Sequence, residues 1–241
     1  MSTASTAALR GDHHVHSTFS DDAVSSLEQN VAAAAAAGLD TLRLVDHVRR
    51  STDWVPEYLA AVSALHAPDG FTVLTGVEAK ILDRSGALDI PALPAGIDRI
   101  LIADHQFPGA DGPLGPSEVR ARLAAGWSDE DALDDLVHAL VSAMERHPGN
   151  QLAHCFSILP KIGLSESRLG AERLAAWASA AAATDTLVEV NEKWGCPEPA
   201  ALIALREAGA GIVASTDSHD AAEVGRYRRV RELLDAAEDL A

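Results

Sequence analysis

Aromatic and basic residues are both scarce in this sequence of 241 residues. Phe, Trp and Tyr together make up only 4% of it, so it lacks the stacking platforms on which single-stranded nucleic acids are bound. Nineteen Lys and Arg stand against 36 Asp and Glu, which gives a formal net charge of −17 at pH 7. Because nucleic-acid backbones are bound by clustered Lys and Arg, we expect no nucleic-acid partner.

Cysteines are few and long apolar runs are missing. The two cysteines, Cys155 and Cys196, lie far apart and form no C-x-x-C pair, so a disulfide scaffold is not indicated and a reducing compartment fits. The first ten residues lack the charged-then-apolar order of a signal peptide. No run reaches the length of a transmembrane helix. These absences predict a cytoplasmic protein that makes no membrane contact.

What the sequence does contain is an alternation of short apolar runs and Ala-rich helical stretches, which is typical of βα units around a parallel sheet or barrel. Strands are expected at residues 9–16, 41–46, 71–77, 97–103, 151–154, 187–191 and 211–215. Helices are expected at residues 25–37, 57–66, 117–125, 129–146, 170–183, 199–208 and 221–237. We therefore predict a single α/β domain over residues 1–241, a barrel one unit short of eight.

Two segments interrupt this alternation. Residues 81–94 are expected to form a loop or a small excursion between two strands. Residues 107–116 are rich in Gly and Pro, so they are expected to be irregular. Because the second segment directly follows a strand end, it is a candidate lid or rim loop.

Possible metal ligands recur at the C-terminal ends of the predicted strands. They are His14, His16, Asp46, His47, Glu78, Asp104, His105, His154, Glu189, Asn191, Glu192, Asp217 and His219. In α/β barrels these strand ends meet on one face, which carries the chemistry. Each residue alone is a weak signal, but chance placement at the same end of all seven strands is hard to sustain. The set predicts a metal centre.

The number and type of these groups indicate which ions they hold. His14 and His16 are two residues apart on a strand, so their side chains point to the same side. Imidazoles together with carboxylates suit Zn, Mn or Fe. A single zinc ion takes only three or four protein ligands, and about nine groups converge here. Two or three divalent ions are therefore expected, an arrangement that activates water and clamps oxygens in a displacement at phosphorus.

Taken in order, these motifs resemble the PHP (polymerase and histidinol phosphatase) family of metal-dependent phosphoesterases. The matching pieces span Asp12 to Asp220. They are DHHVHSTFSDD at residues 12–22, LVDH at 44–47, GVE at 76–78, the strand-end His105, QLAH at 151–154 and STDSHD at 215–220. The resemblance implies a distorted (βα)7 TIM-like barrel with up to three metal ions.

The resemblance also implies a ligand set. The expected ligands are His14, His16, His47, Glu78, His105, His154, Asp217 and His219. One acid of the first motif completes the set, and Asp21 and Asp22 compete for that place, with Asp22 preferred. The loops after the fourth and fifth strands, ADHQFPG and AHCFSILPKIG, depart from the family's usual S-V-H and His-Pro-Thr. Histidinol phosphate is therefore not indicated as the substrate.

The expected function is hydrolysis of a small-molecule phosphate monoester by a metal-bridging hydroxide. The candidate catalytic residues are Asp217, His219 and His105. The candidate phosphate-binding residues are Lys193, Arg49, Lys161 and Arg226. A phosphodiesterase or nucleotidase acting on cyclic or nucleotide phosphates stays open as an alternative, as does a divergent metallohydrolase for a non-phosphate substrate. The complete ligand set disfavours a non-catalytic, metal-stabilised domain.

Overall fold

Seven parallel strands form the centre of the computed structural model, which describes residues 7–240. They are β1 (Gly11–Val15), β2 (Thr41–Val48), β3 (Thr72–Lys80), β4 (Arg99–Ala103), β7 (Gln151–Ala153), β8 (Leu187–Asn191) and β9 (Ile212–Ser215). They pair in the order β1-β2-β3-β4-β7-β8-β9. Most of the N-terminal stretch in which no signal peptide was predicted lies outside the described residues.

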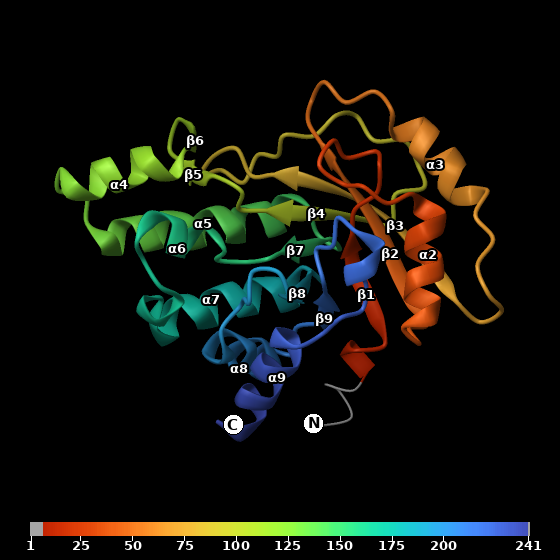
Figure 1. Ribbon diagram of the computed structural model, residues 1–241. Helices are drawn as coiled ribbons and strands as arrows, with labels where there is room; N and C mark the ends of the chain where they lie inside the picture. The colour runs from red at the N-terminus through yellow and green to blue at the C-terminus, as the bar shows by residue number, and fades with distance from the viewer. Residues whose placement is uncertain (1–6, 241) are drawn as a thin grey trace.

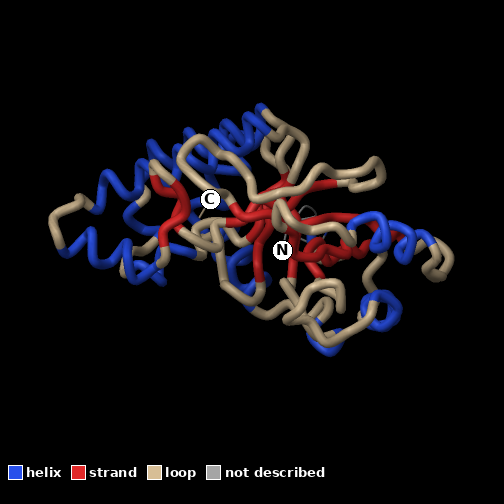
Figure 2. Tube along the Cα trace, turned by 90° about the horizontal axis from the view of Figure 1, so that it is seen from above, coloured by secondary structure: helices blue, strands red, loops and turns tan. Residues whose placement is uncertain are grey.

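The helices lie outside these strands, as Figures 1 and 2 show. In the described chain the α-helices are α2 (Leu27–Ala36), α3 (Val55–Ser63), α4 (Pro116–Ala124), α5 (Asp129–Arg146), α6 (Ile158–Ile162), α7 (Gly170–Ala183), α8 (Pro199–Ala208) and α9 (Arg229–Asp239). Two short 3₁₀ helices are η1 (Glu166–Arg168) and η2 (Ala221–Glu223). No helix of residues 7–240 combines the length and the apolar character that crossing a bilayer requires.

Local sequence explains where these helices begin and end. Ser26 caps α2 through a capping box with Gln29, so side chains satisfy backbone donors at its first turn. Ser128 accepts a hydrogen bond from the Asp131 amide at the start of α5, whose first turn is acidic. Gly209 ends α8 in the left-handed conformation that glycine adopts without strain. The eighteen-residue α5 buries one apolar face against the strands.

The seam between β1 and β9 nearly closes the barrel. Val15 forms a parallel bridge with Ser218, and the His16 amide donates to the Ser218 carbonyl at 2.9 Å. The buried Asp12 carboxylate accepts from the amide and hydroxyl of Thr216 and from the Gly225 amide. Burial raises the pKa of Asp12 to about 6, although these hydrogen bonds oppose the shift. The prediction of a distorted (βα)7 barrel is confirmed.

Two predicted segments differ from the structure. Residues 107–116 are not wholly irregular, because β5 (Phe107–Gly109) and β6 (Gly112–Leu114) pair as an antiparallel hairpin in which Pro108 faces Pro113. Residues 221–237 are not one helix, since the chain turns at Gly225 with φ of 71°. The Gly225 amide donates a hydrogen bond to the Asp12 carboxylate, which holds the chain in this turn. The helix α9 therefore begins only at Arg229.

Candidate metal centre

The predicted ligands converge at the carboxyl ends of the strands. Three groups each place their ligand atoms within 4.8 Å of one another. They are His14, His16 and Asp217; His16, His47 and His219; and His47, Glu78 and His105. Parallel strands explain this convergence, because each strand delivers its terminal residues to the same face. His16 and His47 each belong to two groups, so the three form one continuous centre.

Glu78 lies in the middle of the centre, on β3. Its Oε2 lies 2.9 Å from His47 Nδ1, and its Oε1 lies 3.0 Å from His105 Nε2 and 2.9 Å from His154 Nε2. The side chain is 1% exposed. Burial alone would raise the pKa of Glu78, but His105 and His14 hold it well below its ordinary value. One carboxylate is thus shared among imidazoles from three other strands or strand ends.

The inner part of the centre is fully buried. His14 Nε2 and His16 Nε2 face each other at 3.0 Å, and His16 Nε2 lies 3.4 Å from Asp217 Oδ1. Burial lowers the pKa of His16 to about 3, so its imidazole is neutral, the form that ligates metals. His14 Nδ1, the nitrogen turned away, lies 3.1 Å from Glu189 Oε2. A carboxylate behind a histidine is the usual support of a metal-binding imidazole.

The outer part of the centre places the two acids of the first motif differently. Asp22 Oδ2 lies 3.3 Å from His219 Nε2 and 3.6 Å from His47 Nε2. Asp21 has no histidine nitrogen within 4.0 Å in the described chain. Burial would raise the pKa of Asp22, but His47 and His219 lower it. The structure therefore brings Asp22 to the other predicted ligands and leaves Asp21 on the adjoining pocket wall.

The buried groups show that this centre suits cations. Glu78 Oε2 is buried and lies 2.9 Å from His47 Nδ1, but it forms no well-directed hydrogen bond with any described residue, and a buried carboxylate oxygen without such a bond is costly. Imidazole nitrogens and carboxylate oxygens lie close together at this centre. Zn, Mn and Fe take this mixture of ligands. The residues present fit the divalent ions that the sequence predicts.

Three further carboxylates hold this arrangement in place. Glu189 accepts from the His154 amide and from the side chains of Gln151 and Asn191. Asp104 accepts from Ser157. Asp46, Asp104 and Glu189 appeared among the strand-end candidates, and here they position backbone and imidazoles.

The loops that carry the ligands are held by Asp46, and two of the ligand residues have unusual backbone conformations. Asp46 accepts from the Ser17 amide at 2.9 Å and from the Ser20 hydroxyl at 2.7 Å, which ties down the loop that follows β1. His154 and Asp217 have backbone φ angles of 30° and 53°, values that residues other than glycine seldom adopt. Such backbone conformations persist where surrounding contacts impose them, often at functional sites.

The four basic residues predicted to bind phosphate are not equally placed. Lys193 Nζ lies 3.4 Å from Asp217 Oδ1 and 3.3 Å from His219 Nδ1. Lys161 Nζ lies 3.8 Å from the centre of the Trp194 ring, and Trp194 Nε1 donates to Asp217 Oδ2 at 2.8 Å. Arg49 lines the pocket beside His47. Arg226 is exposed, and its side chain makes no hydrogen bond or ion pair with the described ligand residues.

Lys80 is a site residue that the sequence reasoning missed. It is the last residue of β3 and lines the same pocket as Glu78, His47 and His105. Its position two residues after Glu78 on one strand was the available signal, because side chains two apart share a face. Gln106, whose amide oxygen lies 2.8 Å from Lys80 Nζ, follows His105 directly.

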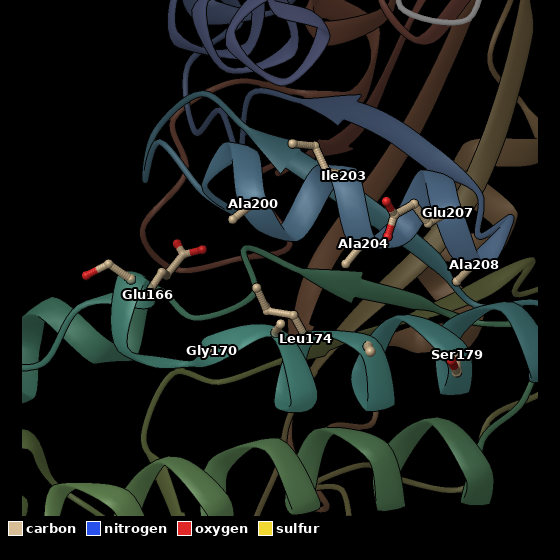
Figure 3. Close-up of a pocket in the computed structure, with 12 residues that line it drawn as sticks. Glu166, Gly170, Leu174, Ser179, Ala200, Ile203, Ala204, Glu207 and Ala208 are labelled. Atoms are coloured by element: carbon tan, nitrogen blue, oxygen red, sulfur yellow. The ribbon is translucent and has the colours of Figure 1, made fainter. Parts of the chain in front are cut away.

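A second concavity lies away from the centre, between α7 and α8 (Figure 3). This groove has a volume of about 580 Å³ and is lined largely by apolar side chains such as Ala171, Leu174, Ala204 and Ile203. No histidine is among its lining residues. Its polar side chains are those of Glu166 and Ser167 near one end and of Glu207 and Ser179 near the other, so it has no metal-ligand set.

Comparison with known proteins agrees with this geometry. The family model of the PHP domain matches residues 12–193. The chain belongs to the PHP family. A probable phosphatase of Enterobacter sp. strain 638 is 27% identical, with 93% of this chain and 84% of that protein aligned. The probable phosphatase YcdX of Escherichia coli K12 is 26% identical, with 94% and 85% aligned.

A solved structure shares the fold of this PHP protein. The histidinol phosphate phosphatase of Lactococcus lactis, complexed with zinc, L-histidinol and phosphate, superposes with a TM-score of 0.65. The match covers 95% of this chain and 92% of that one at 18% identity. At this low identity it supports only the shared barrel fold. The predicted family is confirmed by the family match, and the predicted hydrolase class by the descriptions of the relatives.

Proposed function

We propose that this protein hydrolyses phosphate monoesters of small molecules with the aid of divalent metal ions. The observation that carries the proposal is Glu78, a buried carboxylate contacted by three imidazoles, whose Oε2 forms no well-directed hydrogen bond although His47 Nδ1 lies 2.9 Å away. The descriptions of its relatives as probable phosphatases support a phosphoester substrate. The adjoining pocket of about 390 Å³ is of the size that accommodates a small molecule.

The convergent donor set suits two or three ions, which we propose to be Zn, Mn or Fe. The proposed ligands are His14, His16, Asp22, His47, Glu78, His105, His154, Asp217 and His219. When bound, such ions activate a water molecule and neutralise the oxygens of a phosphoryl group. Asp21 is left out of this set because it has no histidine nitrogen within 4.0 Å among the described residues.

Basic side chains around the ligands hold the phosphate in this proposal. Lys193 is 44% exposed and already contacts two proposed ligands, so its ammonium can donate to a phosphate oxygen at the centre. Lys161 rests on the Trp194 ring beside it, and Arg49 lines the adjoining pocket beside His47. The role predicted for Arg226 has no contact to support it.

The candidate catalytic residues differ in what they can do with a proton. Asp217 is buried, and although burial raises the pKa of its carboxyl, His14 and His16 lower it well below the ordinary value. It therefore stays ionised and acts as an anion rather than as an acid. His105 and His219 are 33% and 18% exposed, so of the three candidates these two face the leaving group.

Metal analysis together with an assay tests the proposal. Purified protein should contain two to three equivalents of Zn, Mn or Fe and should hydrolyse phenyl phosphate. A chelator should abolish the activity, and added Mn or Zn should restore it. His16→Ala should lose both metal and activity, whereas His66→Ala, an exposed histidine on the loop after α3, should retain both.

Other results would change the proposal in specific ways. A metal-free protein that is fully folded and inactive on phosphoesters contradicts it. Activity on diphenyl phosphate without activity on phenyl phosphate replaces the monoester by a diester as the substrate. Activity only on amides or carboxylic esters indicates a divergent metallohydrolase. All of these assays use the same preparation of purified protein.

A further inference from the structure

The lysines of this chain have an unusual distribution. The 241 residues include only three, Lys80, Lys161 and Lys193, while the other sixteen basic residues are arginines. Lys80 and Lys193 lie beside proposed ligands, and Lys161 lies over the ring of Trp194, which donates to Asp217. Many of the arginines are instead engaged in ion pairs on the surface, such as those of Arg168 and Arg173 with α5. In a protein of net charge −17, this places a local group of ammonium ions around the site.

Two of these lysines contact residues on the side of the centre that contains Asp217. Lys193 contacts Asp217 and His219. Lys161 lies over Trp194, which donates to Asp217. Both therefore belong to the flank on which the proposed function places the reacting phosphate.

Lys80 lies on the other flank, in the pocket beside Glu78 and His105. Its Nζ donates to Gln106 Oε1 at 2.8 Å, and no described carboxylate oxygen lies within 4.0 Å of it. The side chain is half-buried. An ammonium has three donors, so a neutral amide partner leaves two donors and a full positive charge available to the pocket.

The other charges of this pocket do not neutralise Lys80. Glu78 and Asp22 belong to the proposed metal ligands. Asp21 and Asp89 also line the pocket, but neither has an oxygen within 4.0 Å of Lys80 Nζ, and one oxygen of Asp89 accepts from the Arg50 amide. Arg49 adds a second cation to the same wall and forms no ion pair within 4.0 Å in the described chain.

We propose that Lys80 binds a second anionic group of the substrate, a carboxylate or a phosphate, in the pocket beside the metal centre. The preferred substrates are then phosphate monoesters that carry an additional negative charge on the alcohol part. This inference rests on the proposed phosphatase function and adds a substrate class to it. Gln106 is the positioning residue, because its amide holds the ammonium toward the pocket.

A matched pair of substrates tests the inference. The probes 4-carboxyphenyl phosphate and 4-carbamoylphenyl phosphate have similar shape and leaving groups but differ by one charge. The wild type should favour the carboxylate in kcat/KM by about 10- to 100-fold, the range expected for a hydrogen bond to a charged group. Lys80→Met should lose this preference, mainly through a higher KM, and Lys80→Arg should recover part of it.

A control variant separates a specific contact from the general field. Arg50→Met removes one positive charge from an exposed residue that does not line the pocket, and it should keep the wild-type preference. Thermal unfolding of each variant establishes that it is folded. Equal preference in the wild type for the two probes, or a preference that survives in Lys80→Met, overturns the inference while the phosphatase function stands. If the wild type hydrolyses neither probe, the proposed function itself is overturned and, with it, the inference.

Discussion

The pKa values of the buried Glu78 at the metal centre and of the half-buried Glu166 in the groove between α7 and α8 are shifted in opposite directions. Burial acts on Glu78 and Glu166 in the same sense, and by itself it raises both pKa values. At the centre, His105 and His14 reverse the effect, and the pKa of Glu78 lies well below its ordinary value. In the groove, the pKa of Glu166 rises to about 8.

The difference lies in the neighbours that each carboxyl group has. Glu166 accepts one hydrogen bond from the Glu198 amide, and no described basic side chain lies within 4.0 Å of its oxygens. Glu78 faces imidazoles on several sides. The centre is therefore built to hold negative charge together with cations, whereas the groove tolerates a carboxyl group best in its neutral form. Replacing each acid by its amide should act in opposite directions in the two regions.

The largest effect is expected for Glu78→Gln. The amide keeps the size of the side chain but removes the charge that imidazoles and ions share. Activity on phenyl phosphate and metal affinity should each fall by more than about 100-fold, beyond the range typical of residues that only support ligands. Metal analysis and steady-state kinetics measure this, with Glu166→Gln as the matched control. A fully loaded, fully active Glu78→Gln variant contradicts a central role for this carboxylate.

Much of this centre was predictable because it depends on position along strands. His14 and His16 share a face through the two-residue period of a strand. Glu78 and His105 come from neighbouring strands whose carboxyl ends must meet. These two rules fix which residues converge, and they need no knowledge of loop conformation.

The parts that escaped prediction depend on contacts between distant loops. Whether Asp21 or Asp22 faces the histidines is decided by the turn after β1, which Asp46 holds through Ser17 and Ser20. The break before α9 arises because Asp12, more than two hundred residues away in sequence, binds the Gly225 amide. The hairpin at 107–114 pairs residues that composition alone marks as irregular.

An intermediate effect is expected from the two acids of the first motif. Asp22→Asn should lower kcat/KM on phenyl phosphate by about 10- to 100-fold, because this carboxylate faces His47 and His219 at the edge of the centre. Asp21→Asn should change it by less than about threefold, as is usual for exposed residues without such contacts. Parallel kinetics on the two variants measure the difference. The reverse order of effects would assign the ligand position to Asp21.

The smallest effect, and one of opposite sign, is expected for Glu166→Gln. The pKa of Glu166 is 4.5 for an unperturbed glutamate and about 8 in the fold, so the folded state binds more protons than the unfolded state between these values. Wild-type stability should therefore fall as pH rises from about 4.5 to about 8. The amide can still accept from the Glu198 amide, but it does not titrate.

Denaturant unfolding at several pH values measures this difference between the wild type and Glu166→Gln. At pH 5 the two should have similar free energies of unfolding, since Glu166 is neutral in the fold. At pH 8.5 the variant should be more stable by about 1 kcal/mol, a figure reduced for the partial exposure of the side chain. A pH-independent difference would mean that Glu166 is solvated as an ordinary carboxylate. The groove would then leave the pKa of its carboxyl group unshifted, and the two regions would no longer act in opposite directions.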